Sequence, residues 1–208
     1  ARGKHIKNLI SLKDDESVVT LMALRDFPED HYLVFATADG TVKKTSLAAY
    51  ANIRSNGLIA LNIEEGNRLV CVRVSNGQQQ ILLLSAQGKA IRFPEQDVRP
   101  TGRVTTGVRG MRLATGDRIV DMEVIDPLPD LPEGMEADES TSDHGMLLTV
   151  TEKGYGKRSL LQDYRLQGRG GSGVINIRAG VRNGLVVGGV LVKPGEGCLL
   201  ISQEGMII

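Results

Sequence analysis

Residues 33–74, LVFATADGTVKKTSLAAYANIRSNGLIALNIEEGNRLVCVRV, alternate short apolar or basic runs with turn residues. The apolar runs are four to seven residues long, rich in Val, Ile and Leu, and bounded by Gly, Asn and Asp. This pattern is typical of β-strands. Helical spacing is not sustained anywhere for the ten to twelve residues that a helix needs. Only Ser46–Tyr50 and Leu160–Tyr164 are expected to form single helical turns.

Two later segments, residues 81–124 and 146–192, repeat this plan. Each unit opens with an apolar run, turns at a glycine and continues into a basic strand, and a second glycine follows 17 or 19 residues after the first. The first glycines are Gly40, Gly88 and Gly154, and the second are Gly57, Gly107 and Gly173. The first glycines are 48 and 66 residues apart, and an insert at 126–145 accounts for the longer interval. The period is therefore about 50 residues.

A repeat of this length with about four strands predicts an all-β, propeller-like array of four-stranded blades. One unit cannot cover its own apolar face, so neighbouring units must pack together. We expect blades at 25–74, 75–124 and 146–192, with a half blade at each end, 1–24 and 193–208. Because the chain starts and stops inside a repeat, we expect it to be a piece of a longer protein.

Composition narrows the class of protein. The 208 residues are 41% hydrophobic and 24% charged, an ordinary globular balance. The absence of Trp excludes WD-type blades. Cys71 and Cys198 are too far apart in sequence, and too isolated from histidines, to indicate a disulfide framework or a zinc site. The longest apolar stretch, 184–192, is too short to span a membrane, and the N-terminus has no signal-like core. We expect a cytoplasmic protein.

The formal net charge of zero conceals an uneven distribution. Residues 126–145 contain seven acids and no Lys or Arg, which leaves 25 basic and 18 acidic residues in the rest of the chain. We predict that this acidic insert is a poorly ordered surface loop in a basic domain. Its acids either serve solubility alone or compete with phosphates for the basic body and so restrain binding.

No catalytic or metal-binding pattern is present in the sequence. His5, His31 and His144 have no neighbouring nucleophile and no metal-ligand spacing. Residues 168–173 match G-x-G-x-x-G, but a strand-like run, VINIR, follows where a dinucleotide site needs a helix. Gly154–Lys157 lacks the earlier glycine of a P-loop. We therefore assign no catalytic residue, no metal and no cofactor to this chain.

Basic residues recur at matching places in the units. On a radial array, such recurrence predicts a basic rim that contacts the phosphates of double-stranded DNA without reading bases. The scarcity of aromatic residues disfavours single-strand binding. A propeller-like scaffold for protein partners is the alternative. The predicted DNA-binding residues are Lys43, Lys44, Arg54, Lys89, Arg92, Arg103, Arg109, Lys157, Arg158, Arg165, Arg169 and Arg178, and Arg99 and Arg112 belong to the same pattern.

Four runs carry a family resemblance: ATADGTVKKT (36–45), TTGVRGMRL (105–113), GYGKRSLL (154–161) and NGLVVGGVLV (183–192). Together they resemble the C-terminal domain family of bacterial DNA gyrase A. The resemblance covers essentially the whole chain and implies a β-pinwheel, normally of six blades, in which the blades exchange strands. The related domain of topoisomerase IV is the alternative, and the order of the motifs favours gyrase.

The resemblance also implies a function. In that family the domain bends duplex DNA around its outer rim and supports ATP-dependent negative supercoiling by an A2B2 holoenzyme. The partners implied are DNA, the rest of gyrase A, and gyrase B. The strand-cleaving tyrosine and the ATPase, with its ATP and Mg, lie outside this domain. Accordingly no cofactor is expected here, and Tyr32, Tyr50, Tyr155 and Tyr164 receive no catalytic role.

One motif departs from the family pattern. Its members carry a box of the form Q-[RK]-R-G-G-[RK]-G in the first blade. Here a similar loop, QGRGGSG, has Gly168 and Ser172 in place of two basic residues, and it lies in a later unit. We interpret it as the equivalent loop of an internal repeat, with Arg169 left for phosphate contact, and we expect the intact box upstream of Ala1. The box-like loop comprises Gln167, Gly168, Arg169, Gly170, Gly171, Ser172 and Gly173.

Overall fold

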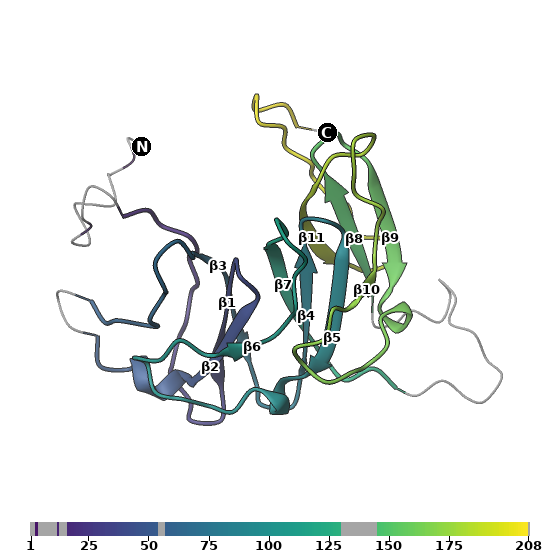
Figure 1. The fold of residues 1–208 in the computed structure, drawn as a ribbon. Coiled ribbons are helices and arrows are strands. Elements are labelled where there is room, and N and C mark those ends of the chain that lie inside the picture. The colour runs from purple at the N-terminus through teal and green to yellow at the C-terminus, as the bar shows by residue number, and fades with distance from the viewer. Residues whose placement is uncertain (1–2, 4–11, 13–15, 54–56, 130–144, 208) are drawn as a thin grey trace.

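The computed structural model describes residues 3, 12, 16–53, 57–129 and 145–207. Most of the expected half blade 1–24, and residues 130–144 of the acidic insert 126–145, lie outside these residues. In the described part the fold is all-β, as the sequence predicts. Three antiparallel sheets stand side by side in a curved row (Figure 1).

The first two sheets have four strands each and the third has three in the described residues. The first sheet, in the order β3-β1-β2-β6, contains β1 (Tyr32–Thr37), β2 (Thr41–Ser46), β3 (Leu69–Ser75) and β6 (Val108–Arg109). The second, β10-β5-β4-β7, contains β4 (Gln80–Ser85), β5 (Lys89–Pro94), β7 (Ile119–Ile125) and β10 (Val174–Ile175). The third, β11-β8-β9, contains β8 (Met146–Thr151), β9 (Gly156–Leu160) and β11 (Val186–Val192).

Short 3-10 helices follow the second strand of each unit. Two of them, η2 (Leu47–Tyr50) and η4 (Leu161–Asp163), confirm the predicted single turns. The third, η3 (Glu95–Asp97), was not predicted, because the sequence PEQD that contains it lacks the apolar residues of the other two.

The sheets exchange strands between sequence units. Strand β6 belongs to the second unit but pairs with β2 of the first, with Thr41 opposite Arg109. Strand β10 belongs to the third unit and pairs with β5 of the second, with Lys89 opposite Ile175. The strand exchange that the resemblance implies is therefore present. In the described residues no strand covers β9 in this way.

The second glycine of each later unit makes this exchange possible. At Gly107 φ is +108°, and a Cβ would lie 2.4 Å from the Val42 carbonyl oxygen across the junction. At Gly173 φ is +69°, and a Cβ would lie 2.3 Å from the Ala90 carbonyl oxygen. A side chain at either position would collide with the neighbouring backbone and would occupy an unfavourable conformation. The glycines thus recur because each unit docks closely on the preceding one.

Apolar clusters fill the space between adjacent sheets. One cluster joins the first two sheets and includes Val34, Leu83 and Phe93. Another joins the second sheet to the third and includes Leu84 and Leu147. Each sheet therefore buries its apolar residues against its neighbour, as expected for units that cannot cover their own faces.

Candidate nucleic-acid interface

Two equivalent segments run along the outer strands of the first two sheets. We call residues 98–112 and 164–178 the covering segments, since each comes from one unit and lies against the outer strand of the unit before it. The Thr101 amide donates to the Lys44 carbonyl oxygen at 2.9 Å, and the Gln167 amide donates to the Arg92 carbonyl oxygen at 3.1 Å. The same register is therefore used at both junctions.

The covering segments carry arginines at equivalent positions. The three pairs are each separated by 66 residues in the sequence. Five of the six arginines are exposed and Arg103 is half-buried. Because the segments occupy equivalent places on consecutive sheets, the pairs repeat along the outer edge of the row. The pairs are Arg99 and Arg165, Arg103 and Arg169, and Arg112 and Arg178.

Three exposed arginines from two units meet at the box-like loop. The Arg169 guanidinium donates to the Arg109 carbonyl oxygen at 3.1 Å and to the Asp97 carbonyl oxygen at 2.9 Å. The Arg112 amide donates to the Gly171 carbonyl oxygen at 2.8 Å. We call Arg109, Arg112 and Arg169 the junction cluster. These contacts bring three exposed arginine residues together at one junction, beside the Asp97 carboxylate, whose Oδ2 accepts from the Arg169 amide at 3.3 Å. A concentration of exposed arginines suits an anionic polymer.

The predicted exposure of Lys43 and Lys44 is wrong. Their relative exposures are 1% and 3%, because the covering segment from the next unit lies over β2. Lys43 Nζ donates to the Ala60 carbonyl oxygen at 2.6 Å and also to the Arg103 carbonyl oxygen. Burial, and then the charge of Arg103, lowers the pKa of Lys43 to about 8. Neither ammonium lies on the surface that a DNA backbone would reach.

Lys44 forms a buried ion pair that the sequence analysis missed. Its ammonium lies 3.3 Å from Glu95 Oε2, and the side chains are 4% and 0% exposed. Glu95 also accepts hydrogen bonds from the Ser75 hydroxyl and the Gln79 amide, both at 2.7 Å. A signal was available in the repeat, because Glu95 occupies the position of Leu47 and Leu161 in the other units. An acid at a core position indicates a buried partner.

Arg92 is also buried, at 7% exposure, which contradicts its predicted place on the rim. It occupies the position of Lys44 in the second unit and is covered in the same way, by residues 166–167. Its guanidinium donates to Gln80 Oε1 at 3.2 Å, and burial lowers the pKa of the guanidinium. Lys89 is half-buried beside β10. Arg54 lies outside the described residues.

Lys157 and Arg158 occupy the positions of Lys43 and Lys44 in the third unit, yet both are exposed. Strand β9, which carries them, has no covering segment in the described residues. Lys157 Nζ donates to the Asn176 carbonyl oxygen at 3.1 Å, the counterpart of the contact between Lys43 and Ala60. Their exposure thus reflects an uncovered strand, and their contact with DNA stays a prediction.

Two of the tyrosines use their hydroxyl groups to form hydrogen bonds within their own unit. The Tyr50 hydroxyl donates to the Ala60 carbonyl oxygen at 3.1 Å, and the Tyr164 hydroxyl lies 2.6 Å from Asn176 Oδ1. Burial raises the pKa of Tyr164 to about 12. Both phenols therefore hold the chain that follows the second glycine of their own unit.

Other site types find no support in the described residues. The G-x-G-x-x-G match is followed by strand β10, which confirms that it is not a dinucleotide-binding turn. Among the residues described, no His, Cys, Asp and Glu side chains gather in threes or more to hold a metal ion. No helix in the same residues is long and apolar enough to cross a membrane.

The fold and the rim together define a class: propeller-like arrays of antiparallel sheets that exchange strands and present arginines along the outer edge. The sequence profile of the family described as "DNA gyrase C-terminal domain, beta-propeller" matches residues 1–25, 31–76, 79–126 and 145–193. The chain belongs to this family.

Individual relatives agree with this assignment. The chain is 38% identical over 208 residues to the DNA gyrase A protein of Escherichia coli K12, and 39% identical over the same length to that of Klebsiella oxytoca. Each alignment covers the whole of this chain but only 22% of the length of the relative.

Two solved structures share the fold. A topoisomerase IV C-terminal domain superposes with a TM-score of 0.84 at 27% identity, over 99% of this chain and 60% of that one. A gyrase A C-terminal domain superposes with a TM-score of 0.83 at 26% identity, over 100% of this chain and 64% of that one.

Proposed function

We propose that this chain is the DNA-wrapping domain of a gyrase A protein, and that it bends duplex DNA around its arginine rim. The observation that carries the proposal is the junction cluster, in which two units present Arg109, Arg112 and Arg169 at one site. Family membership supports the same function.

The chemistry of the rim suits duplex phosphates. Arginine side chains bind phosphate oxygens through planar, charge-assisted hydrogen bonds. The exposed arginines recur with the unit, and the phosphates of a duplex also form a regular line. Contacts of this kind position DNA without reading its sequence. A stiff duplex stays bent only while successive contacts hold it, so a curved row of cationic sites stabilises the bend.

The wider assembly is also a proposal. The chain spans 22% of its gyrase relatives, so the supercoiling reaction belongs to a larger protein. We infer that the domain acts beside the rest of gyrase A and beside gyrase B in the cytoplasm, and that ATP and Mg are used elsewhere in the holoenzyme. The domain itself needs no cofactor to bind phosphates.

Topoisomerase IV is the second candidate. The two solved relatives are equally similar in shape, with TM-scores of 0.84 and 0.83, so the fold does not separate them. Sequence does favour one, because the chain is 38% identical to a gyrase A protein over its full length.

The proposal is tested by the salt dependence of duplex binding. Replacing Arg112 and Arg169 by Gln removes two junction-cluster charges, so the log–log slope of affinity against salt should flatten by up to about two units. The loss should be equal for unrelated DNA sequences. Arg68→Gln, an exposed arginine next to the inner strand β3, is the matched control and should leave the slope unchanged. An unchanged slope in the double variant, or no duplex binding at low salt, would favour the protein-scaffold alternative.

A further inference from the structure

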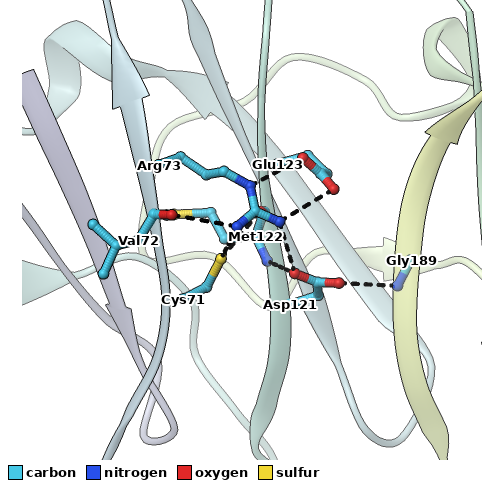
Figure 2. A network of polar contacts seen from close by, with 7 residues as sticks. All are labelled: Cys71, Val72, Arg73, Asp121, Met122, Glu123 and Gly189. Carbon is cyan, nitrogen blue, oxygen red and sulfur yellow. Dashed lines mark hydrogen bonds and ion pairs between the residues drawn. The ribbon is translucent and has the colours of Figure 1, made fainter. Parts of the chain in front are cut away.

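A second charged network lies on the inner strands, at the opposite sheet edge from β6. Figure 2 shows its contacts from close by. Arg73 on β3 reaches across to β7, where its Nε lies 3.3 Å from Glu123 Oε2 and its Nη2 lies 3.5 Å from Asp121 Oδ1. The guanidinium also donates to the Val72 carbonyl oxygen at 3.3 Å. One planar group thus joins the first sheet to the second.

Asp121 extends the network to the third sheet. Its Oδ2 accepts a hydrogen bond from the Gly189 amide of β11 at 3.1 Å, while its Oδ1 accepts one from the Met122 amide at 2.9 Å. The three innermost strands, β3, β7 and β11, are therefore connected through a single carboxylate (Figure 2).

The network is specific to this part of the row. Each inner strand pairs in the same register, with Ser75, Ile125 and Val192 at equivalent positions. By that register Arg73 is equivalent to Glu123 and to Val190. Opposite charges therefore occupy one repeat position in the first two units, and an apolar residue occupies it in the third. The fold does not require charges there.

Directional contacts at the inner edge would restrict the angle between neighbouring sheets more than apolar packing alone does. Apolar packing between sheets is non-directional, whereas a guanidinium contacting two carboxylates permits little rotation. The rim lies three strand spacings from β3, about 14 Å at roughly 4.8 Å each. A rotation of about 5° at the inner edge would move the rim by roughly 1 Å, enough to disturb a hydrogen bond to phosphate.

From these contacts we infer that Arg73 is a positioning residue. Together with Asp121 and Glu123 it fixes the angle between neighbouring sheets, and that angle determines how strongly bound DNA is bent. This inference rests on the proposed function. It separates the residues that bind DNA, on the rim, from the residues that set the curvature, on the inner strands.

We expect the ion pairs themselves to contribute only modestly to stability. The Arg73 side chain is 35% exposed, and the Asp121 and Glu123 side chains are 20% and 13% exposed. These side chains are partly exposed, so solvent screens the pairs in part, and removing Arg73 should not unfold the sheets, whose apolar clusters remain. The geometric role can therefore be tested in a folded protein.

The test uses the full-length protein that carries this chain, with Arg73→Gln as the variant and Arg68→Gln as the charge-matched control. Nicked circular DNA is saturated with each protein and then ligated, and the linking-number change per bound protein is measured. Because the protein is saturating, this readout reports the geometry of wrapping and not affinity. We expect the change to fall at least twofold for Arg73→Gln and to be unaffected by Arg68→Gln. The duplex affinity of both variants should stay within about twofold of that of the unaltered protein. Their Tm should stay within about 5 °C of its Tm.

Arg73→Lys adds a conservative variant, since it keeps the charge but cannot make the forked contact. We expect it to recover less than half of the lost linking-number change. Full recovery would overturn the role of the fork. An unchanged linking number for Arg73→Gln, or equal losses in affinity and linking number, would overturn the inference. If the unaltered protein produced no linking-number change, the proposed function itself would fail.

Discussion

Replacing Lys44 by Met tests whether this residue serves the core or the surface. The substitution keeps the apolar stem and removes an ammonium that lies 3.3 Å from Glu95 Oε2. If Lys44 were a surface phosphate contact, the change would weaken DNA binding and leave stability nearly unaltered. The structure predicts the reverse.

The magnitude follows from the burial of the partner. The Glu95 side chain is 0% exposed, so its carboxylate would remain in the interior without a counter-charge. Removing one partner of a buried ion pair costs about 3–5 kcal/mol. For a chain of this size about 1 kcal/mol lowers Tm by roughly 2–4 °C, so we expect a decrease of roughly 6–20 °C.

The assay combines urea denaturation with a double-variant cycle. Adding Glu95→Gln to Lys44→Met should restore part of the lost stability, because the neutral amide oxygen can still accept from the Gln79 amide while the amide NH2 can donate to the Ser75 hydroxyl oxygen. Lys43→Met is the control at the adjacent buried lysine, whose ammonium donates to two carbonyl oxygens and lies over the Phe35 ring, and it should cost less than Lys44→Met because it leaves no buried carboxylate unpaired. A loss below about 1 kcal/mol for Lys44→Met, together with a flatter salt slope for DNA binding, would refute the burial argument.

Three further predictions concern the junctions and the charge distribution. Gly173→Ala should destabilise the protein by about 1–3 kcal/mol in urea denaturation, because the added Cβ would lie 2.3 Å from the Ala90 carbonyl oxygen. The control Gly168→Ala should cost less than about 1 kcal/mol, because a Cβ at Gly168 would have no neighbour within 4 Å. The free energy of unfolding should rise by up to about 3 kcal/mol as the pH increases from about 8 to about 10.4. Lys43 has a pKa of about 8 in the folded protein and its ordinary, higher pKa in the unfolded chain, so the unfolded chain binds more protons in this window. This rise should be smaller in Lys43→Met, and equal pH profiles for the two proteins would count against it. Deleting residues 126–145 should strengthen duplex binding at low salt if its seven acids compete with phosphates, and unchanged affinity would leave solubility as their role.

The sequence was sufficient for the local structure and the family. Short β-branched runs between Gly, Asn and Asp give strands for reasons that act within a few residues, and the existence of a repeat follows from the recurrence of Gly40, Gly88 and Gly154. The exposed arginines of the covering segments, such as Arg165 and Arg169, were likewise predicted from recurrence alone. An arginine side chain that reaches solvent can bind phosphate, because its planar guanidinium matches the geometry of phosphate oxygens.

Only the tertiary structure decided which basic residues reach the surface. Lys43, Lys44 and Lys157 look alike in sequence, but the first two lie beneath a segment from the next unit and the third does not. That covering depends on β6, a strand of two residues that pairs with a strand more than sixty residues earlier and has no recognisable pattern of its own. Likewise, Arg73 and Glu123 are equivalent positions in separate units, and nothing local shows that they touch. Burial and charge pairing are set by contacts between units, whereas a repeat pattern reports only what each unit does within itself.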